Sequence, residues 1–174
     1  MEINFLYEKD SILPAPSEET LKSFEDYWKV LLPKDYLYFI NEYNGIILEE
    51  DSFFILNNKK VAINEFCSIL DRKYLNDPSL GFLPEHDINV IDSGKFMFFT
   101  DKKNEDELGG DVIPIAIVYH TCYVCFDCRK DKNNPTICFY DIDLVEDENN
   151  IELDKLLTPI TEKFSDFLNM IKSK

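Results

Sequence analysis

The 174-residue sequence is poor in glycine, histidine and basic side chains. Its five glycines form neither a phosphate-cradling loop nor a dinucleotide-binding fingerprint, which argues against nucleotide binding. Lys and Arg together number 18 and form no cluster of the kind that phosphate contacts require. We therefore expect no direct binding to nucleic acid and no docking on an anionic membrane surface.

Long apolar runs are also absent, because no run approaches the roughly 20 residues that a membrane-spanning helix needs. The first residues, Met1 to Phe5, show neither the basic region nor the apolar region of a signal peptide. These two absences predict a cytoplasmic protein without a membrane partner. In the cytoplasm we expect the five cysteines to be reduced thiols.

What the sequence does contain is negative charge and apolar bulk. Asp and Glu number 34, so the formal net charge is 18 − 34 = −16, and each third of the chain is acidic. Hydrophobic residues make up 45% of the chain and aromatic residues 14%, enough to build a core despite the charge. The length predicts a single domain over residues 1–174.

The first half of the sequence predicts helices with clear ends. Ser17 is a good N-cap for an amphipathic helix over 18–31, and Pro33 can begin a second helix that ends at Asn44-Gly45. The apolar runs within 46–56 suggest a hairpin around three acidic residues, and the apolar spacing within 63–74 suggests a third helix.

The second half predicts mainly strands. Residues 96–99, 112–119, 122–129 and 136–142 are rich in β-forming residues, and the short connectors after 119 and 129 favour an antiparallel meander. A final helix is expected over 158–171, with Thr158-Pro159 as its cap and first turn. The predicted fold class is α+β, with a central antiparallel sheet and helices at both ends.

The cysteines include one motif with chemical meaning. Cys122, Cys125 and Cys128 form a C-x-x-C-x-x-C run similar to the iron–sulfur ligands of bacterial ferredoxins. The residues between them favour a strand, in which Cys125 faces away from Cys122 and Cys128. We therefore expect no metal and no cofactor, although a metal-binding protein that uses these three cysteines is an alternative.

The sequence provides few residues for catalysis. A histidine acting as general base would have to be His86 or His120. His120 would share a strand face with Cys122, but neither an orienting group nor an oxyanion donor can be assigned to that pair. We expect a protein that is not an enzyme.

Acidic residues concentrate in two segments, 101–111 and 141–154. The second holds seven acidic side chains and no Lys or Arg. Neither segment has the alternating carboxylates and closing Glu of a calcium loop. We therefore take ten of these residues as candidates for contact with a basic partner: Asp101, Glu105, Asp106, Glu107, Asp111, Asp141, Asp143, Glu146, Asp147 and Glu148.

The order of short motifs along the chain resembles the SUKH superfamily, which includes the fungal Smi/Knr cell-wall regulator domain and many bacterial immunity proteins. The matching segments are Leu32-Pro33-x-Asp35-Tyr36, Phe39-Ile40, Asn44-Gly45, Ile113-Pro114-Ile115-Ala116, Phe126-Asp127, Phe139-Tyr140-Asp141 and Phe164-Ser165-Asp166-Phe167-Leu168. Two positions depart from the family pattern, because Ile46 and Tyr119-His120-Thr121 stand where the family has glycine.

The resemblance implies a non-enzymatic bacterial immunity protein that binds and neutralises a cognate toxin domain, such as a nuclease or deaminase. A toxin that handles nucleic acid tends to carry a basic groove, which an acidic protein can approach quickly and cover. A cytosolic regulatory or scaffold module, as the fungal members imply, is the alternative from another class.

Overall fold

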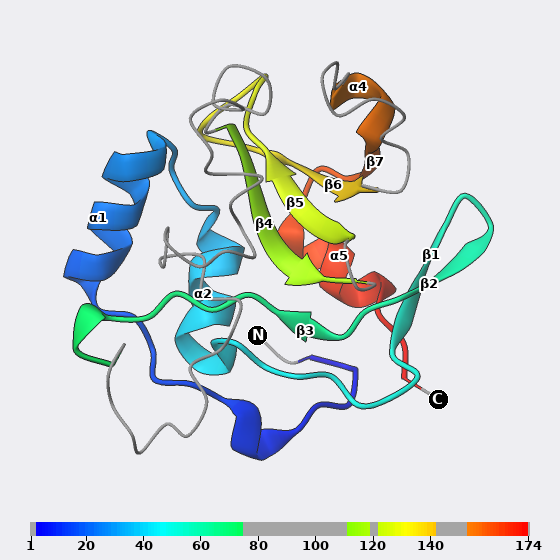
Figure 1. Ribbon diagram of the computed structural model, residues 1–174, viewed down its shortest axis with the longest axis horizontal. Coiled ribbons are helices and arrows are strands. Elements are labelled where there is room, and N and C mark those ends of the chain that lie inside the picture. Colours follow the sequence, from blue (N-terminus) through cyan, green and yellow to red (C-terminus); the bar gives the residue numbers. More distant parts are fainter. Residues whose placement is uncertain (1–2, 75–110, 119–121, 142–152, 174) are drawn as a thin grey trace.

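The first helix begins where the sequence predicts its cap. A computed structural model describes residues 3–74, 111–118, 122–141 and 153–173 (Figure 1). The Ser17 hydroxyl accepts the N–H of Thr20 at 3.2 Å and so caps α1 (Glu18–Trp28). The helix ends because Lys29 takes a left-handed conformation, three residues before the predicted end.

The second helix, α2 (Lys34–Tyr43), follows Pro33 as predicted. Gly45, just beyond its end, has a φ of 66°, a conformation that glycine adopts without strain. A Cβ atom there would lie 2.5 Å from Leu13 Cδ1 and 3.0 Å from the Cβ of Ser68. Both the backbone angle and the close packing therefore favour glycine at the end of α2.

Strands form two antiparallel sheets. The five-stranded sheet has the order β3-β4-β5-β6-β7, and the two-stranded sheet pairs β1 with β2 and extends away from it (Figure 1). The strands are β1 (Phe53–Leu56), β2 (Lys59–Ala62), β3 (Glu65–Phe66), β4 (Val112–Ile117), β5 (Tyr123–Asp127), β6 (Thr136–Tyr140) and β7 (Leu157–Thr161). The α+β class and the meander of the second half are confirmed. The predicted strand at 96–99 lies outside the described residues.

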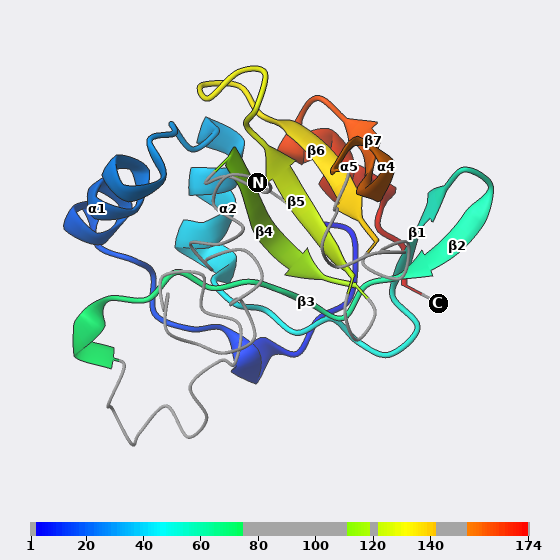
Figure 2. The same ribbon diagram turned by 45° about the horizontal axis from the view of Figure 1, so that its top comes forward.

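Helices α2 and α5 (Phe164–Met170) pack on one face of the five-stranded sheet (Figure 2). Phe164 lies at the centre of this packing, with its ring centroid 5.0 Å from that of Tyr36, 5.2 Å from Phe39 and 6.2 Å from Phe126. All four rings are buried. One aromatic cluster therefore joins both helices to β5. The other helical segments among the described residues are 3-10 turns at Lys9–Ser11 and Arg72–Tyr74 and the helix α4 (Leu153–Leu156).

The predicted hairpin within 46–56 is wrong, because residues 53–56 pair with 59–62 instead. Asn57 and Asn58 connect the two strands and both have positive φ, as a two-residue hairpin turn requires. Residues 46–48 instead lie between 7–8 and 64–66, joined to them by backbone hydrogen bonds. The Asn-Asn pair was the signal for the actual turn.

The predicted helix over 63–74 is also wrong. Most of this segment is extended, with β3 paired to β4, and only Arg72–Tyr74 forms a helical turn. Residues 66–71 are all buried, so their apolar spacing reflects a strand that is covered on both faces. Spacing alone does not separate such a strand from a buried helix.

The final helix begins six residues later than predicted. Thr158 and Pro159, expected to cap it, lie in β7, where Pro159 is opposite Cys138 of β6. Proline donates no hydrogen bond, and β7 is the last strand of the sheet order, where a proline can be accommodated. Helix α5 begins at Phe164, after Lys163.

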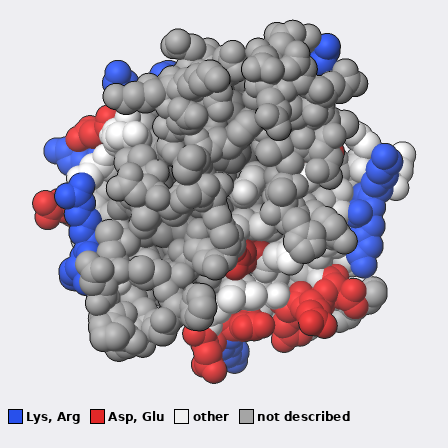
Figure 3. Space-filling model, in the orientation of Figure 1, with Lys and Arg blue, Asp and Glu red and all other residues white. Residues whose placement is uncertain are grey.

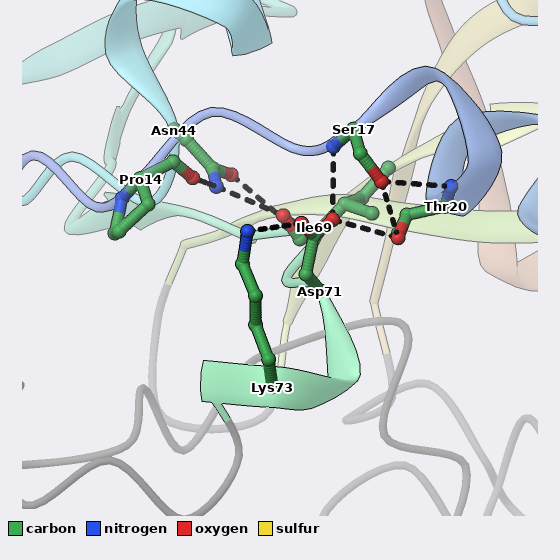
Figure 4. Close-up of polar contacts among 7 residues, drawn as sticks. All are labelled: Pro14, Ser17, Thr20, Asn44, Ile69, Asp71 and Lys73. Atoms are coloured by element: carbon green, nitrogen blue, oxygen red, sulfur yellow. Dashed lines mark hydrogen bonds and ion pairs between the residues drawn. The ribbon is translucent and has the colours of Figure 1, made fainter.

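A buried carboxylate links the start of α1 to the segment that follows β3 (Figure 4). Asp71 Oδ1 accepts the backbone N–H of Ser17 at 2.8 Å and the hydroxyl of Thr20 at 2.7 Å. Its Oδ2 lies 3.3 Å from Nζ of Lys73. Burial raises the pKa of Asp71, but the hydrogen bonds from Ser17, Thr20 and Lys73 together outweigh it and lower the pKa to about 2.

This arrangement predicts a specific response to acid. The pKa of Asp71 is lower in the folded chain than its ordinary value of 3.8, so its contribution to stability is complete above pH 3.8 and is lost as the pH falls through 2. At neutral pH we expect the free energy of unfolding of the wild type to be about 1 to 2 kcal/mol higher than that of Asp71→Asn. Urea unfolding at several pH values should show that gap closing between about pH 4 and pH 2. A gap that stays constant over this range would contradict the assignment.

Candidate partner-binding surface

Two of the ten acidic residues predicted to contact a partner, Asp111 and Asp141, lie in the described part of the chain. Asp111 precedes β4 and Asp141 follows β6. Strands β4 and β6 each pair antiparallel with β5, so they run in the same direction. Asp111 lies at the start of one and Asp141 at the end of the other, which places the two aspartates at opposite ends of the sheet. The other eight residues lie outside the described residues: Asp101, Glu105, Asp106, Glu107, Asp143, Glu146, Asp147 and Glu148.

Both described aspartates are half-buried and make contacts within the chain. Asp111 Oδ1 lies 2.8 Å from Nζ of Lys132, and its carbonyl accepts the N–H of Cys128. Asp141 Oδ1 accepts the thiol of Cys122 at 3.5 Å, and its N–H donates to the carbonyl of Leu156. The charge of Asp111 therefore already has a cationic partner, which weakens its attraction for a second one.

The five cysteines are buried free thiols. Burial is the main cause that raises the pKa of Cys128 to about 12 and of Cys138 to about 11, and it raises the pKa of Cys125 well above its ordinary value. Protonated thiols are poor nucleophiles and poor metal ligands. Cys125 lies opposite Cys138 in the sheet, on the other face from Cys122 and Cys128. Within the described residues, no three His, Cys, Asp or Glu side chains are placed to hold a metal ion.

The structure assembles a different acidic surface from three separate segments. Backbone hydrogen bonds join 6–8 to 47–49 and 46–48 to 64–66, so these segments continue the five-stranded sheet beyond β3. Five carboxylate side chains line a groove at this margin, contributed by Glu8, Glu49, Glu50, Asp51 and Glu65. We call it the acidic groove.

The acidic groove has a volume of about 480 Å³. Its lining also includes Ile47, Ile63 and Ile117. Ile63 and Ile117 are buried, whereas Ile47 is 38% exposed. Figure 3 shows acidic side chains gathered along the lower edge of the molecule, over the segments that form this groove. The groove thus combines several carboxylates with one exposed apolar side chain, that of Ile47.

Comparison with known families supplies the remaining observation. A family model described as SMI1-KNR4 cell-wall, SUKH_6, matches residues 18–168. The chain belongs to the SMI1-KNR4 family. The comparison with curated proteins finds no match. Membership confirms the resemblance drawn from the motifs and supports a protein-interaction or immunity-type module.

The motif residues of this SMI1-KNR4 family member have structural roles. Asp35 Oδ1 accepts the N–H of Tyr36 at 3.0 Å, and its Oδ2 accepts the N–H of Ser165 at 2.8 Å, so one carboxylate binds a first-turn N–H group of both α2 and α5. Ile113-Pro114-Ile115-Ala116 lies in β4 and is fully buried. The motifs therefore build the scaffold, and the acidic groove lies beside them.

Sequence reasoning missed the acidic groove because its residues are far apart in the chain. Glu49-Glu50-Asp51 was interpreted as the turn of a hairpin, and neither Glu8 nor Glu65 stands in an acidic run. Only the pairing of 6–8, 46–49 and 63–65 brings them together.

No helix among the described residues is long and apolar enough to cross a membrane.

Proposed function

We propose that this protein is a non-enzymatic immunity protein that binds a cognate toxin domain and neutralises it. The observation that carries the proposal is the SMI1-KNR4 family match over residues 18–168. The toxin domain we expect is basic, such as a nuclease or deaminase, because the protein has a net charge of −16. A bacterial cytoplasmic location is part of the same proposal.

The charge supports the proposal through a physical mechanism. An acidic protein attracts a basic partner over several ångströms, and such steering raises association rates by roughly ten to a thousand-fold. The attraction is screened by salt, so association should slow as ionic strength rises. Binding that covers a basic active site would block nucleic acid without any chemical step by the immunity protein.

The direct test is co-expression in bacteria with the toxin domain encoded next to the gene for this protein. We expect the toxin domain alone to stop growth and co-expression with this chain to restore it. An unrelated acidic protein of similar size serves as the control for charge. Failure to restore growth against any neighbouring toxin domain would overturn the proposal.

The alternative is a regulatory or scaffold module, favoured by the cell-wall description of the matching family. Under this alternative the protein binds another protein of its own cell rather than a toxin domain. Pull-down at low and then high salt separates the two, because an immunity protein should capture the toxin domain and a scaffold should not.

A further inference from the structure

We propose that the acidic groove is the surface that docks an extended basic segment of a protein partner. This inference rests on the proposed function only for the basic character of the partner. The groove differs from the two acidic segments inferred from the sequence. It lies on the margin of the sheet, is formed by three paired segments, and combines carboxylates with the exposed side chain of Ile47.

Uncompensated charge is the first argument. Glu8, Glu49 and Glu50 are exposed, and none of the three forms an ion pair with another residue in the described ranges. The described carboxylates that already form ion pairs, such as Asp127 with Arg129 at 2.8 Å, attract a second cation less strongly. The groove therefore presents negative charge that a cation from outside the chain can neutralise.

Exposed apolar surface is the second argument, and it indicates what kind of cation fits. Ile47 lines the groove and is 38% exposed, and Leu6, on the adjoining paired segment outside the lining, is 51% exposed. Lysine and arginine have long apolar stems that pack on such surfaces while their charged ends reach carboxylates. A bare metal ion gains nothing from contact with an apolar side chain. No three acidic groups among the described residues are placed to hold a metal ion together.

Backbone support is the third argument. Glu8 N–H donates to the carbonyl of Ile47 at 2.9 Å, and Glu49 N–H donates to the carbonyl of Leu6 at 3.2 Å. Both glutamates are therefore held on paired backbone rather than on a free loop. Binding to a preformed surface loses less conformational entropy than binding that must first order a loop.

The test compares two triple variants with the same net charge. Glu8→Gln/Glu49→Gln/Glu50→Gln removes three charges from the groove, and Asp26→Asn/Glu42→Gln/Glu162→Gln removes three exposed charges elsewhere, so each has a net charge of −16 + 3 = −13. The probe is a fluorescent peptide of alternating lysine and leucine, with affinity measured by anisotropy at low salt. Circular dichroism checks that both variants remain folded.

We expect the groove variant to bind the peptide at least about tenfold more weakly than the control variant, and Ile47→Thr to weaken binding several-fold. Equal binding by the two triple variants would overturn the inference, because only net charge would then matter. It would also be overturned if free spermine bound as tightly as the peptide and lost affinity in the same variant.

The two proposals fail in different ways. If the groove variant still neutralises the toxin domain as well as the control variant does, the docking inference falls and the immunity function stands. If the wild type neutralises no neighbouring toxin domain, the proposed immunity function is wrong. If the groove variant then still binds the peptide more weakly than the control variant does, the docking surface is supported.

Discussion

Replacing Asn44 with leucine is expected to lower the free energy of unfolding by about 3 to 5 kcal/mol. Asn44 is 1% exposed, and its side chain joins two segments (Figure 4). Its Nδ2 donates to the carbonyl of Pro14 at 2.7 Å and to the carbonyl of Ile69 at 2.9 Å, and its Oδ1 accepts the N–H of Ile69 at 3.0 Å. Leucine has similar size but leaves all three backbone groups without these partners.

Urea unfolding monitored by circular dichroism measures this loss. Asn41→Ala is the matched control, because Asn41 is an exposed asparagine in α2, three residues before Asn44. We expect the control to change stability by no more than about 0.5 kcal/mol. A loss below about 1 kcal/mol for Asn44→Leu would show that the three hydrogen bonds do not hold these segments together.

Truncating Phe164 to alanine should destabilise the fold to a similar extent, by about 3 to 5 kcal/mol. Phe164 is 1% exposed and lies within 6.4 Å, between ring centroids, of each of five aromatic neighbours. Those neighbours belong to α2, β3, β5 and α5. The cavity left by the ring would therefore weaken the packing of both helices on the sheet.

Thermal and urea unfolding together check this prediction. Tyr38→Ala removes an aromatic ring that is 51% exposed on α2, and we expect its effect to stay within about 0.5 kcal/mol. Equal effects of the two substitutions would contradict the central position assigned to Phe164. Because the total stability of a domain is about 5 to 15 kcal/mol, unfolding of Phe164→Ala should be measured at low temperature.

The sequence predicted helices well where capping residues mark their ends. Ser17 and the Asn44-Gly45 pair each indicated a helix boundary through local chemistry, and α1 and α2 lie where these signals place them. The strands β4, β5 and β6 were predicted because β-forming runs alternate with short connectors.

Other elements were mispredicted because their structure depends on distant neighbours. Residues 63–70 have helical spacing, but β4 provides backbone hydrogen bonds that make the segment extended. Pro159 can begin a helix, yet it lies in β7 because β6 is available as a partner on one side. The residues of each segment alone do not indicate that these partner strands are available.

The candidate surface shows the same division. Acidic residues that are neighbours in sequence could be found by counting charge, and this gave the acidic segments 101–111 and 141–154. The acidic groove joins Glu8 to Glu49 and Glu65, so it exists only once the sheet margin has formed. Contact of the ten acidic residues in these segments with a partner stays a prediction, since eight of them lie outside the described residues.

Affinity for the toxin domain encoded beside this gene tests the account most directly. Purified wild type, the groove variant and the equally charged control variant would each be titrated with that domain by calorimetry at low and high salt. We predict that wild type and the control bind alike, that the groove variant binds at least about tenfold more weakly, and that salt reduces this difference. Equal affinity of all three proteins, or no binding by wild type, would contradict it.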